Sequence, residues 1–349
     1  YVVQNQNDIT FPFKRYQIQT VWRADRPQKG RFREFLQCDA DVVGSKSLWQ
    51  EVELVQLYDA VFSELKLEGV TIKMNNRKIL SGIAEVIGAE DKLIDFTVAL
   101  DKLDRISEEG VKTEMLTKGI SEAAIEKLKP LFSARGNTSE KLTMLKNLLP
   151  TSEIGMQGIS DLEFIVDSIS ELKLRSAKLE IDVTLARGLN YYTGVIFEVT
   201  PPEGVQMASI GGGGRYDDLT GIFGLKDKDV SGIGISFGLD RIYLVLEDLD
   251  LFPETVSANT LVLFINFGES EALYVVRAIT KLRNLGIAAE LYPDAFKIGK
   301  QMSYCDNRKI PFVVLAGSSE IEANTFTLKN MKNGKQETVS FNGLLKALK

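Results

Sequence analysis

The sequence of 349 residues contains no histidine. This absence excludes an imidazole acid–base catalyst, a serine–histidine–aspartate triad and a histidine-ligated metal site. Only two cysteines are present, Cys38 and Cys305, and they give neither a disulfide framework nor a metal-binding spacing. We therefore expect a reducing, cytoplasmic setting. Chemistry in this chain must depend on positioning, on arginine and on carboxylates.

Long apolar runs are also missing, since none approaches the ~20 residues that a membrane-spanning helix needs. The chain begins YVVQN, without a methionine or a targeting signal, and we expect further sequence before it. With 44% hydrophobic and 26% charged residues, the composition is typical of a globular protein of two or three domains. No membrane partner is predicted.

The net charge of −6 is unevenly distributed along the chain. Residues 258–349 contain 12 basic and 8 acidic residues, a net charge of +4, so the part before them carries −10. A basic C-terminal domain suits contact with a polyanion. Ordinary scatter of surface charge is the alternative explanation.

Apolar periodicity predicts a first part that is rich in strands. The predicted elements are strands at 16–22, 34–43 and 70–74 and a helix at 47–67. We expect Ser47 and Gln50 to form a capping box at the start of the helix, and Gly69 to end it. A turn is predicted at Asn75 and Asn76.

Residues 88–176 differ in character, because they are helix-rich and strongly charged. We interpret them as a helical insertion, whose clearest helix places Leu162 and Ile165 on one apolar face. Strictly alternating residues then predict a strand at 179–185, with a neighbouring strand at 194–200.

A break in the pattern near residues 253–259 separates a C-terminal domain. The elements predicted beyond it are strands at 261–266, 287–292 and 312–315 and helices at 271–285 and 297–309. This alternation of strands and helices predicts a small α/β domain with a largely parallel sheet.

The most informative segment is RADRPQKGRFREF, residues 23–35, here called the basic segment. Between Lys14 and Arg33 the chain contains seven lysines or arginines and one acid, Asp25. Two strands around a basic loop can bind a nucleotide, since arginines bind phosphate and Phe35 can stack on a base. Alternation places Gln37 and Asp41 on the same strand face as Phe35. A solvated basic hairpin is the alternative.

A second segment, LARGLNYYTG at 185–194, lies between two predicted strands and contains one arginine, two tyrosines and two glycines. In the family that this segment resembles, named below, a substrate carboxylate approaches a triphosphate that repels it, and a fixed guanidinium such as that of Arg187 would offset this repulsion and stabilise the transition state. A carboxylate nucleophile needs no general base, so the lack of histidine would be no obstacle to that reaction. An ordinary hairpin turn is the alternative.

A third segment, GIGISFGLDR at 232–241, has glycines at alternate positions. Alternate glycines leave one strand face free of side chains, so a flat ligand can lie against the backbone, and the helix that follows presents Arg241. Phe237 stands where a dinucleotide-binding fingerprint needs its third glycine, which argues against a dehydrogenase. A strand adapted to close packing remains the alternative.

Together these segments resemble motif 2, the signature peptide and motif 3 of the histidyl-tRNA synthetases, a family of class II aminoacyl-tRNA synthetases. The stretch GGGGRYD at 211–217 resembles the family's sequence near the amino-acid pocket, and the resemblance covers essentially the whole chain. It implies an α+β fold, in which an antiparallel-sheet catalytic core with a helical insertion precedes an α/β anticodon-binding domain. The implied boundaries are 1–87 and 177–252 for the core, 88–176 for the insertion and 258–349 for the anticodon-binding domain.

The resemblance also implies residue roles toward ATP. The implied ATP-binding residues are Arg23 at the α-phosphate, Arg241 at the γ-phosphate, Asp25 and Arg31 elsewhere in the site, and Phe35 stacked on adenine. Magnesium accompanies ATP in this family. Its ligands stay unknown, although Glu180 and Glu198, on the strands that flank the signature peptide, are candidates.

Toward the amino acid, the resemblance implies a pocket for L-histidine. The implied histidine-binding residues are Gln37, Asp41, Arg187, Tyr191 and Tyr192. Arg187 and Arg23 are the implied catalytic residues, because Arg187 bridges the substrate carboxylate and the α-phosphate. Arg26, Gln28 and Lys29 lie in the loop that reaches toward the acceptor end of tRNA. Asn190 is a mild departure, since family members commonly have aspartate there.

The implied reaction joins ATP and L-histidine into histidyl-adenylate and then transfers histidine to the 3′ end of tRNA(His), in a homodimer. The alternative is a non-catalytic, histidine-binding regulatory paralogue of histidine biosynthesis. Intact Arg23 and Arg241 and the C-terminal domain argue against it. Motif 1 and the acidic loop that binds the α-amino group are expected before Tyr1, and a chain that truly lacks them should lose most amino-acid activation.

Overall fold

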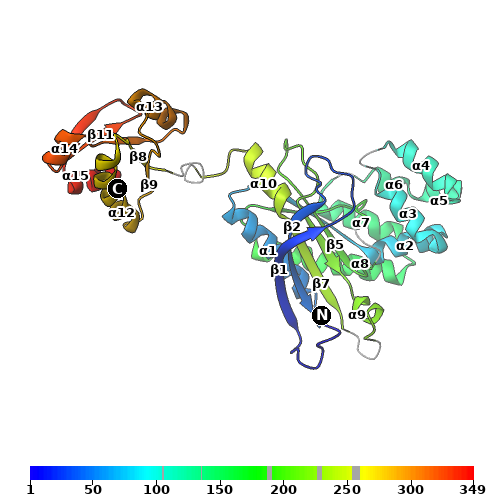
Figure 1. The fold of residues 1–349 in the computed structure, drawn as a ribbon. Coiled ribbons are helices and arrows are strands. Elements are labelled where there is room, and N and C mark those ends of the chain that lie inside the picture. The colour runs from blue at the N-terminus through cyan, green and yellow to red at the C-terminus, as the bar shows by residue number, and fades with distance from the viewer. Residues whose placement is uncertain (104–105, 135, 187–190, 226–229, 254–259) are drawn as a thin grey trace. The chain divides into compact units, whose positions relative to one another are not determined.

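The computed structural model describes residues 1–103, 106–134, 136–186, 191–225, 230–253 and 260–349 (Figure 1). The chain forms two compact units, Tyr1–Leu251 and Phe252–Lys349. Within the described ranges, every helix is too short or too polar to span a bilayer.

The first unit is built on a seven-stranded sheet with the order β1-β2-β7-β6-β5-β3-β4. Its strands are β1 (Phe13–Trp22), β2 (Glu34–Val43), β3 (Thr71–Asn76), β4 (Lys178–Ile181), β5 (Val195–Thr200), β6 (Gly211–Arg215) and β7 (Gly232–Gly238). Neighbouring strands are antiparallel except for β3 and β4. The predicted antiparallel sheet is therefore confirmed.

The helical elements of this unit are α1 (Trp49–Glu64), α2 (Arg77–Ile87), η1 (Glu90–Lys92), α3 (Leu93–Leu100), α4 (Glu108–Thr117), α5 (Glu122–Lys127), α6 (Lys129–Phe132), α7 (Thr138–Leu148), α8 (Glu153–Leu172), α9 (Leu219–Ile222) and α10 (Leu239–Asp248). Helices α3 to α6 lie on the side of the unit away from β1 (Figure 1). Side-chain oxygens of Ser107, Ser121, Asn137 and Ser152 cap α4, α5, α7 and α8. The predicted helix-rich character is present, whereas the boundaries of the insertion stay a prediction.

The first helix differs from its prediction at both ends. Its N-cap residue, Leu48, makes no side-chain hydrogen bond, so Ser47 and Gln50 form no capping box. At the other end, Lys66 rather than Gly69 follows the helix in the left-handed conformation, with φ of 57°. Both predictions were wrong, and at the start of the helix the contacts of Arg215 with the carbonyls of Ser45 and Ser47, described below, hold the chain instead.

The predicted turn at Asn75 and Asn76 is also wrong, since both residues complete β3 and are fully buried. Asn76 caps α2 by accepting a hydrogen bond from the Lys78 amide. The Asn75 amide group donates to the carbonyls of Val183 (3.3 Å) and Leu185 (2.8 Å). These asparagines satisfy buried backbone groups and do not reverse the chain.

The strand predicted at 179–185 is shorter, because β4 ends at Ile181. Asp182 accepts hydrogen bonds from the amide and the hydroxyl of Thr184 (3.1 and 2.7 Å), which turns the chain out of the sheet. The strand predicted as its neighbour, β5, is separated from β4 by β3.

Helix α1 packs on one face of the sheet. Its buried Tyr58 and Phe62 contact the ring of Phe237 on β7, with centroid distances of 4.9 and 5.8 Å. The Tyr58 hydroxyl donates to the carbonyls of Gly212 (3.0 Å) and Ser236 (3.2 Å). Since side chains alternate along a strand, Phe237 faces the helix and Ser236 faces the opposite side.

A buried ion pair joins this helix to β6. The guanidinium of Arg215 contacts the carboxylate of Glu51 through Nε–Oε1 (2.5 Å) and Nη2–Oε2 (2.7 Å). Arg215 also donates to the carbonyls of Ser45 (3.0 Å) and Ser47 (3.3 Å) and to the Ser231 hydroxyl (2.7 Å). Burial raises the pKa of Glu51, and the hydrogen bond from Arg215 opposes this rise. This bidentate contact fixes the start of α1 against the sheet.

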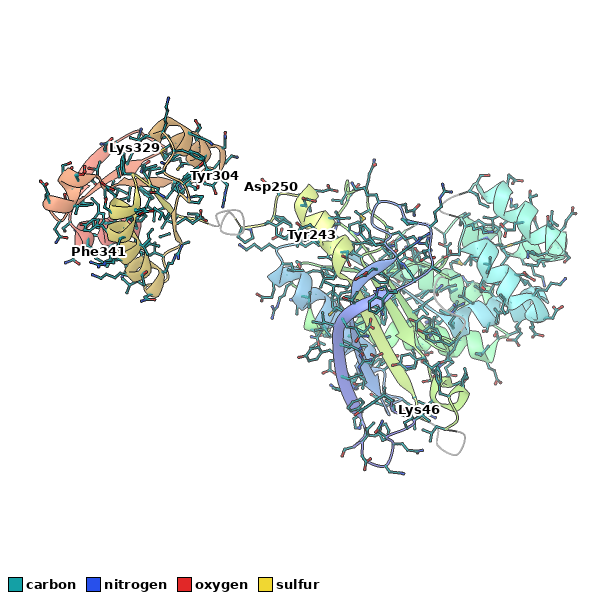
Figure 2. The ribbon with its side chains drawn as sticks, viewed as in Figure 1. Lys46, Tyr243, Asp250, Tyr304, Lys329 and Phe341 are labelled. Carbon is teal, nitrogen blue, oxygen red and sulfur yellow. The ribbon has the colours of Figure 1, made fainter. Side chains whose placement is uncertain are left out.

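The second unit has a five-stranded sheet of order β12-β11-β10-β8-β9. Its elements are β8 (Val262–Phe264), α12 (Glu269–Asn284), β9 (Ala289–Leu291), α13 (Ile298–Asn307), β10 (Phe312–Leu315), α14 (Ser318–Glu322), β11 (Phe326–Asn330), β12 (Gln336–Val339) and α15 (Phe341–Leu348). The prediction of a largely parallel sheet is half correct, because β9, β8 and β10 are parallel and β10, β11 and β12 are antiparallel. Phe341, labelled in Figure 2, begins α15, and its ring centroid lies 6.4 Å from that of Phe326 on β11, a strand that the sequence analysis did not predict.

We predict that Glu51→Gln lowers the free energy of unfolding of the first unit by about 3 kcal/mol, because it removes the closer, fully buried carboxylate partner of Arg215 and leaves the more distant Asp217 at 3.5 Å. Glu53→Gln on the same helix is the matched control. Glu53 forms an exposed ion pair with Lys14, so we expect a change within about 0.5 kcal/mol. Urea unfolding followed by circular dichroism measures both, and equal stabilities of the two variants would contradict the role of the pair.

Candidate active site

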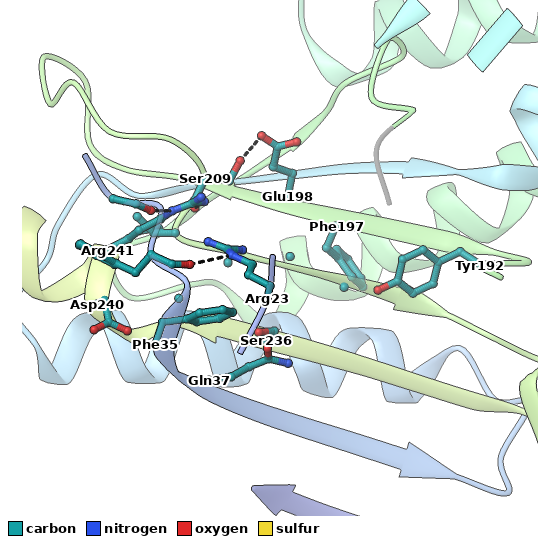
Figure 3. Close-up of a pocket in the computed structure, with 17 residues that line it drawn as sticks. Arg23, Phe35, Gln37, Tyr192, Phe197, Glu198, Ser209, Ser236, Asp240 and Arg241 are labelled. Carbon is teal, nitrogen blue, oxygen red and sulfur yellow. Dashed lines mark hydrogen bonds between the residues drawn. The ribbon is translucent and has the colours of Figure 1, made fainter. Parts of the chain in front are cut away.

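A cavity of about 370 Å³ lies where β2, β7, β6 and β5 meet the basic segment and the start of α10 (Figure 3). Five residues that the sequence analysis assigned to two different ligands line it together. They are Arg23, Phe35, Gln37, Tyr192 and Arg241. We call this cavity the central pocket.

Two arginines, Arg23 and Arg241, line the central pocket, and a third, Arg31, pairs with Asp25 beside them, so one end of the pocket is strongly positive. The guanidinium of Arg241 is fixed, because it donates to the carbonyls of Gly30 (2.6 Å) and Ser209 (2.6 Å). Burial, followed by the charges of Arg23 and Arg31, lowers the pKa of Arg241. Arginine nonetheless stays protonated in proteins, so this end of the pocket suits a polyphosphate.

Asp25 pairs with two of these arginines. Its carboxylate contacts Arg23 Nε (3.0 Å) and Arg31 Nη2 (3.0 Å), and the hydrogen bond from Arg31 lowers the pKa of Asp25. The guanidinium of Arg23 also lies over the ring of Phe35, 4.2 Å from its centroid. One face of the predicted adenine platform is thus covered by Arg23, so a base that stacks on that face must displace the guanidinium.

The two candidate magnesium ligands lie in different places. Glu198 is largely buried in the central pocket and accepts a hydrogen bond from the Ser209 hydroxyl. Glu180 instead lines a separate cavity with Lys73 and Lys141. No group of three potential ligands among the described residues can hold a metal by itself. Mg²⁺ commonly binds one or two carboxylates together with substrate phosphates, a combination that Glu198 fits.

A second pocket of about 680 Å³ contains Asp41 and Tyr191. The Asp41 carboxylate accepts a hydrogen bond from the Tyr216 hydroxyl (2.8 Å) and contacts Arg15 Nη1 (3.0 Å). Burial raises the pKa of Asp41, and these two partners oppose the rise. The rings of Tyr191 and Tyr192 lie 4.6 Å apart, and Tyr192 lines the central pocket. The tyrosine pair therefore stands where the two pockets meet.

The alternating glycines of β7 do not leave a bare strand face as expected. A Cβ atom at Gly234 would lie 2.1 Å from the Asp41 carboxylate, and one at Gly232 would lie 2.2 Å from the Tyr216 ring. These glycines make room for two site side chains rather than for a ligand. Only farther along the strand do Ser236 and Gly238 line the central pocket.

The residues assigned to the tRNA acceptor end line neither pocket. Arg26, Gln28 and Lys29 are exposed on the loop of the basic segment, and Lys29 lies 3.7 Å from Asp248. Their predicted role stays a prediction. Arg187 and the residues up to Asn190 lie outside the described residues.

Sequence reasoning missed two residues that hold Asp41. Arg15 lies directly opposite Asp41 in the register of β1 and β2, so antiparallel pairing of the two predicted strands would have found it. Tyr216 was quoted only as part of a glycine-rich stretch. Its contact depends on the order of strands in the sheet, which periodicity does not reveal.

Two family models match the chain. The model for histidyl-tRNA synthetase matches residues 5–242, and the model for an anticodon-binding domain matches residues 261–349. Together they cover both structural units.

Close relatives match the chain over its whole length. The histidine–tRNA ligase of Christiangramia forsetii is 70% identical over 349 residues, which are 100% of this chain and 76% of the relative. That of Flavobacterium johnsoniae is 67% identical over 348 residues, which are 100% of this chain and 73% of the relative.

Solved structures agree with these matches. Histidyl-tRNA synthetase from Nostoc sp. PCC 7120 aligns with a TM-score of 0.82 at 30% identity, over 100% of this chain and 80% of that one. An ATP phosphoribosyltransferase regulatory subunit/histidyl-tRNA synthetase from Bacillus halodurans aligns with a TM-score of 0.67 at 20% identity, over 87% of this chain and 74% of that one. The second likeness concerns the fold alone.

We predict that Arg241→Met weakens binding of a non-hydrolysable ATP analogue about 100-fold, because it removes a fixed charge from the pocket. Arg26→Met is the control, since Arg26 is an exposed arginine of the facing loop outside the pocket, and we expect less than a threefold change. Isothermal titration calorimetry measures both affinities. Equal affinities of the two variants would show that the nucleotide does not bind at this end of the pocket.

Proposed function

The chain belongs to the histidyl-tRNA synthetase family, and from this membership we propose that it activates L-histidine with ATP and transfers it to tRNA(His). The activity is that of a histidine–tRNA ligase, an aminoacyl-tRNA synthetase. The observation that carries this conclusion is the 67–70% identity to such ligases over the full chain. The same identity favours the ligase over the regulatory paralogue, whose likeness is limited to the fold.

ATP is proposed to bind in the central pocket. Arg23 and Arg241 line one end of it, where the triphosphate would lie, Arg31 adds a third positive charge close by, and Phe35 offers a ring for adenine. Asp25 holds Arg23 and Arg31 near each other, so both are oriented before the nucleotide arrives. Orientation before binding reduces the entropy that would otherwise be lost in the complex.

Histidine is proposed to bind beside the nucleotide, between the tyrosine pair and β2. Gln37 and Tyr192 line the central pocket, and Asp41 and Tyr191 line the adjoining one. Because Tyr216 and Arg15 fix its carboxylate, Asp41 offers a stationary acceptor for a substrate N–H group. Two tyrosine rings and a fixed acceptor suit a planar imidazole that carries a donor.

The proposed chemical step needs no base from the protein. An oxygen of the histidine carboxylate forms a bond to the α-phosphorus, the bond from that phosphorus to the bridging oxygen breaks, and pyrophosphate leaves with the electron pair. The proposed role of Arg187 and Arg23 is to stabilise the charge that accumulates on the α-phosphate. Mg²⁺ would neutralise phosphate charge when bound, and Glu198 is its proposed protein ligand in the pocket.

The tRNA is proposed to contact both structural units. Arg26, Gln28 and Lys29 are exposed on the loop beside the central pocket and are available to its acceptor end. The second unit matches the anticodon-binding family, and residues 258–349 have a net charge of +4 in a chain that is acidic as a whole. Both described cysteines are free, which supports the proposed cytoplasmic location.

A homodimer is supported by an apolar stripe on the edge strand of the large sheet. Tyr16, Ile18 and Trp22 share one face of β1 and are 77%, 57% and 71% exposed. Large exposed apolar side chains at a sheet edge usually mark an interaction surface. We propose that this stripe belongs to the class II dimer interface.

The function is tested by pyrophosphate–ATP exchange in the full-length protein with each of the twenty amino acids in turn. We expect exchange with histidine alone and a loss of about 10³-fold in kcat for Arg187→Ala. Histidine binding without exchange would indicate the regulatory paralogue. Exchange with a different amino acid would show that the signature peptide does not determine specificity as proposed.

The dimer is tested by Ile18→Lys. A charge in a buried apolar interface costs several kcal/mol, so we expect sedimentation velocity to show a shift from dimer to monomer. Ile94→Lys, at a similarly exposed position on α3, is the control and should leave the dimer unchanged. An unaltered dimer in Ile18→Lys would exclude this stripe from the interface.

A further inference from the structure

We infer that Lys141, on α7 of the helical part, is a positioning residue for the segment that leads into Arg187. This inference rests on the proposed function only for the role of Arg187. The structural part of the inference is that the Lys141 side chain, from a helix, holds the end of β4, where the chain leaves the large sheet.

Lys141 is 8% exposed, which is rare for a lysine. Its Nζ donates to Glu180 Oε1 (2.8 Å) and to the carbonyl of Ile181 (2.8 Å), the last two residues of β4. A buried ammonium is costly unless its hydrogen bonds are satisfied, so these contacts confine both the helix and the strand end. They also give Glu180 a role other than binding magnesium.

The residues that follow β4 are held one after another. Asp182 contacts Lys73 Nζ (2.9 Å), and the side-chain amide of Asn75 donates to the carbonyls of Val183 and Leu185. Lys73 and Asn75 both belong to β3. The anchored stretch therefore extends to Leu185, two residues before Arg187.

Lys141 differs from Lys73 and Asn75 in the element to which it belongs. Lys73 and Asn75 lie in the sheet itself, whereas Lys141 lies on a helix of the 88–176 part. A shift of α7 would move the end of β4 relative to β3, and the segment after β4 would follow. Displacements near 1 Å at a reacting group can reduce a rate by about 100-fold.

The test compares Lys141→Met with Lys146→Met in the full-length protein. Lys146 is on the same helix but pairs with Glu163 of α8 (2.5 Å) and does not contact β4. For Lys141→Met we expect kcat of histidine-dependent exchange to fall about tenfold, with KM for ATP within twofold of wild type, because the arginine end of the central pocket is untouched. Lys146→Met should change neither, and Lys141→Arg should recover most of the rate.

Hydrogen exchange provides a readout that does not depend on activity. We expect faster exchange of amides 182–186 in Lys141→Met than in Lys146→Met. If Lys141→Met fails to fold, Glu180→Gln replaces it, with a smaller change in the same direction. The inference would be overturned by an unchanged kcat in Lys141→Met, by an equal loss of kcat in both lysine variants, or by an unchanged rate of hydrogen exchange at amides 182–186. Absence of histidine-dependent exchange in the wild type would instead overturn the proposed function, and hydrogen exchange alone would then decide the inference.

Discussion

The arrangement of the first unit depends on the buried contact between Arg215 and Glu51. The guanidinium binds the helix through the Glu51 carboxylate, the β2–α1 connection through two carbonyls, and β7 through the adjacent Ser231. Its contact with the Ser47 carbonyl holds that residue just before the helix, where the Ser47 hydroxyl accepts a hydrogen bond from the Trp49 amide (3.4 Å). The next residue, Tyr216, holds Asp41, so the ion pair that fixes the helix also positions one wall of the second pocket.

Charge in the site is concentrated by geometry and not by composition. The whole chain is acidic, yet Arg23 of the basic segment and Arg241 of α10 line one cavity, with Arg31 close by and Asp25 as the partner of Arg23 and Arg31. The carboxylate of Asp25 offsets the mutual repulsion of the two arginines that it contacts. Asp25 therefore allows a dense positive charge to exist in the absence of nucleotide.

Local patterns predicted the elements well where a single strand or helix decides them. The alternation at 34–43 and the glycine strand at 232–238 have the bounds that the structure shows. Features that depend on distant partners were missed, such as the buried role of Asn75, the position of β3 between β4 and β5, and the contact of Tyr216 with Asp41. Strand order is a property of the folded chain, because each strand pattern is compatible with many neighbours.

The two tryptophans lie in different surroundings, and this has an optical consequence. Trp49 packs edge-on against Phe164, with ring centroids 5.2 Å apart, whereas Trp22 ends β1 in an exposed position directly before Arg23. A chain with phenylalanine at position 49 would carry Trp22 as its single tryptophan. Indole emission depends on local polarity, so this tryptophan, one residue from an arginine of the central pocket, would report on the basic segment without any attached dye.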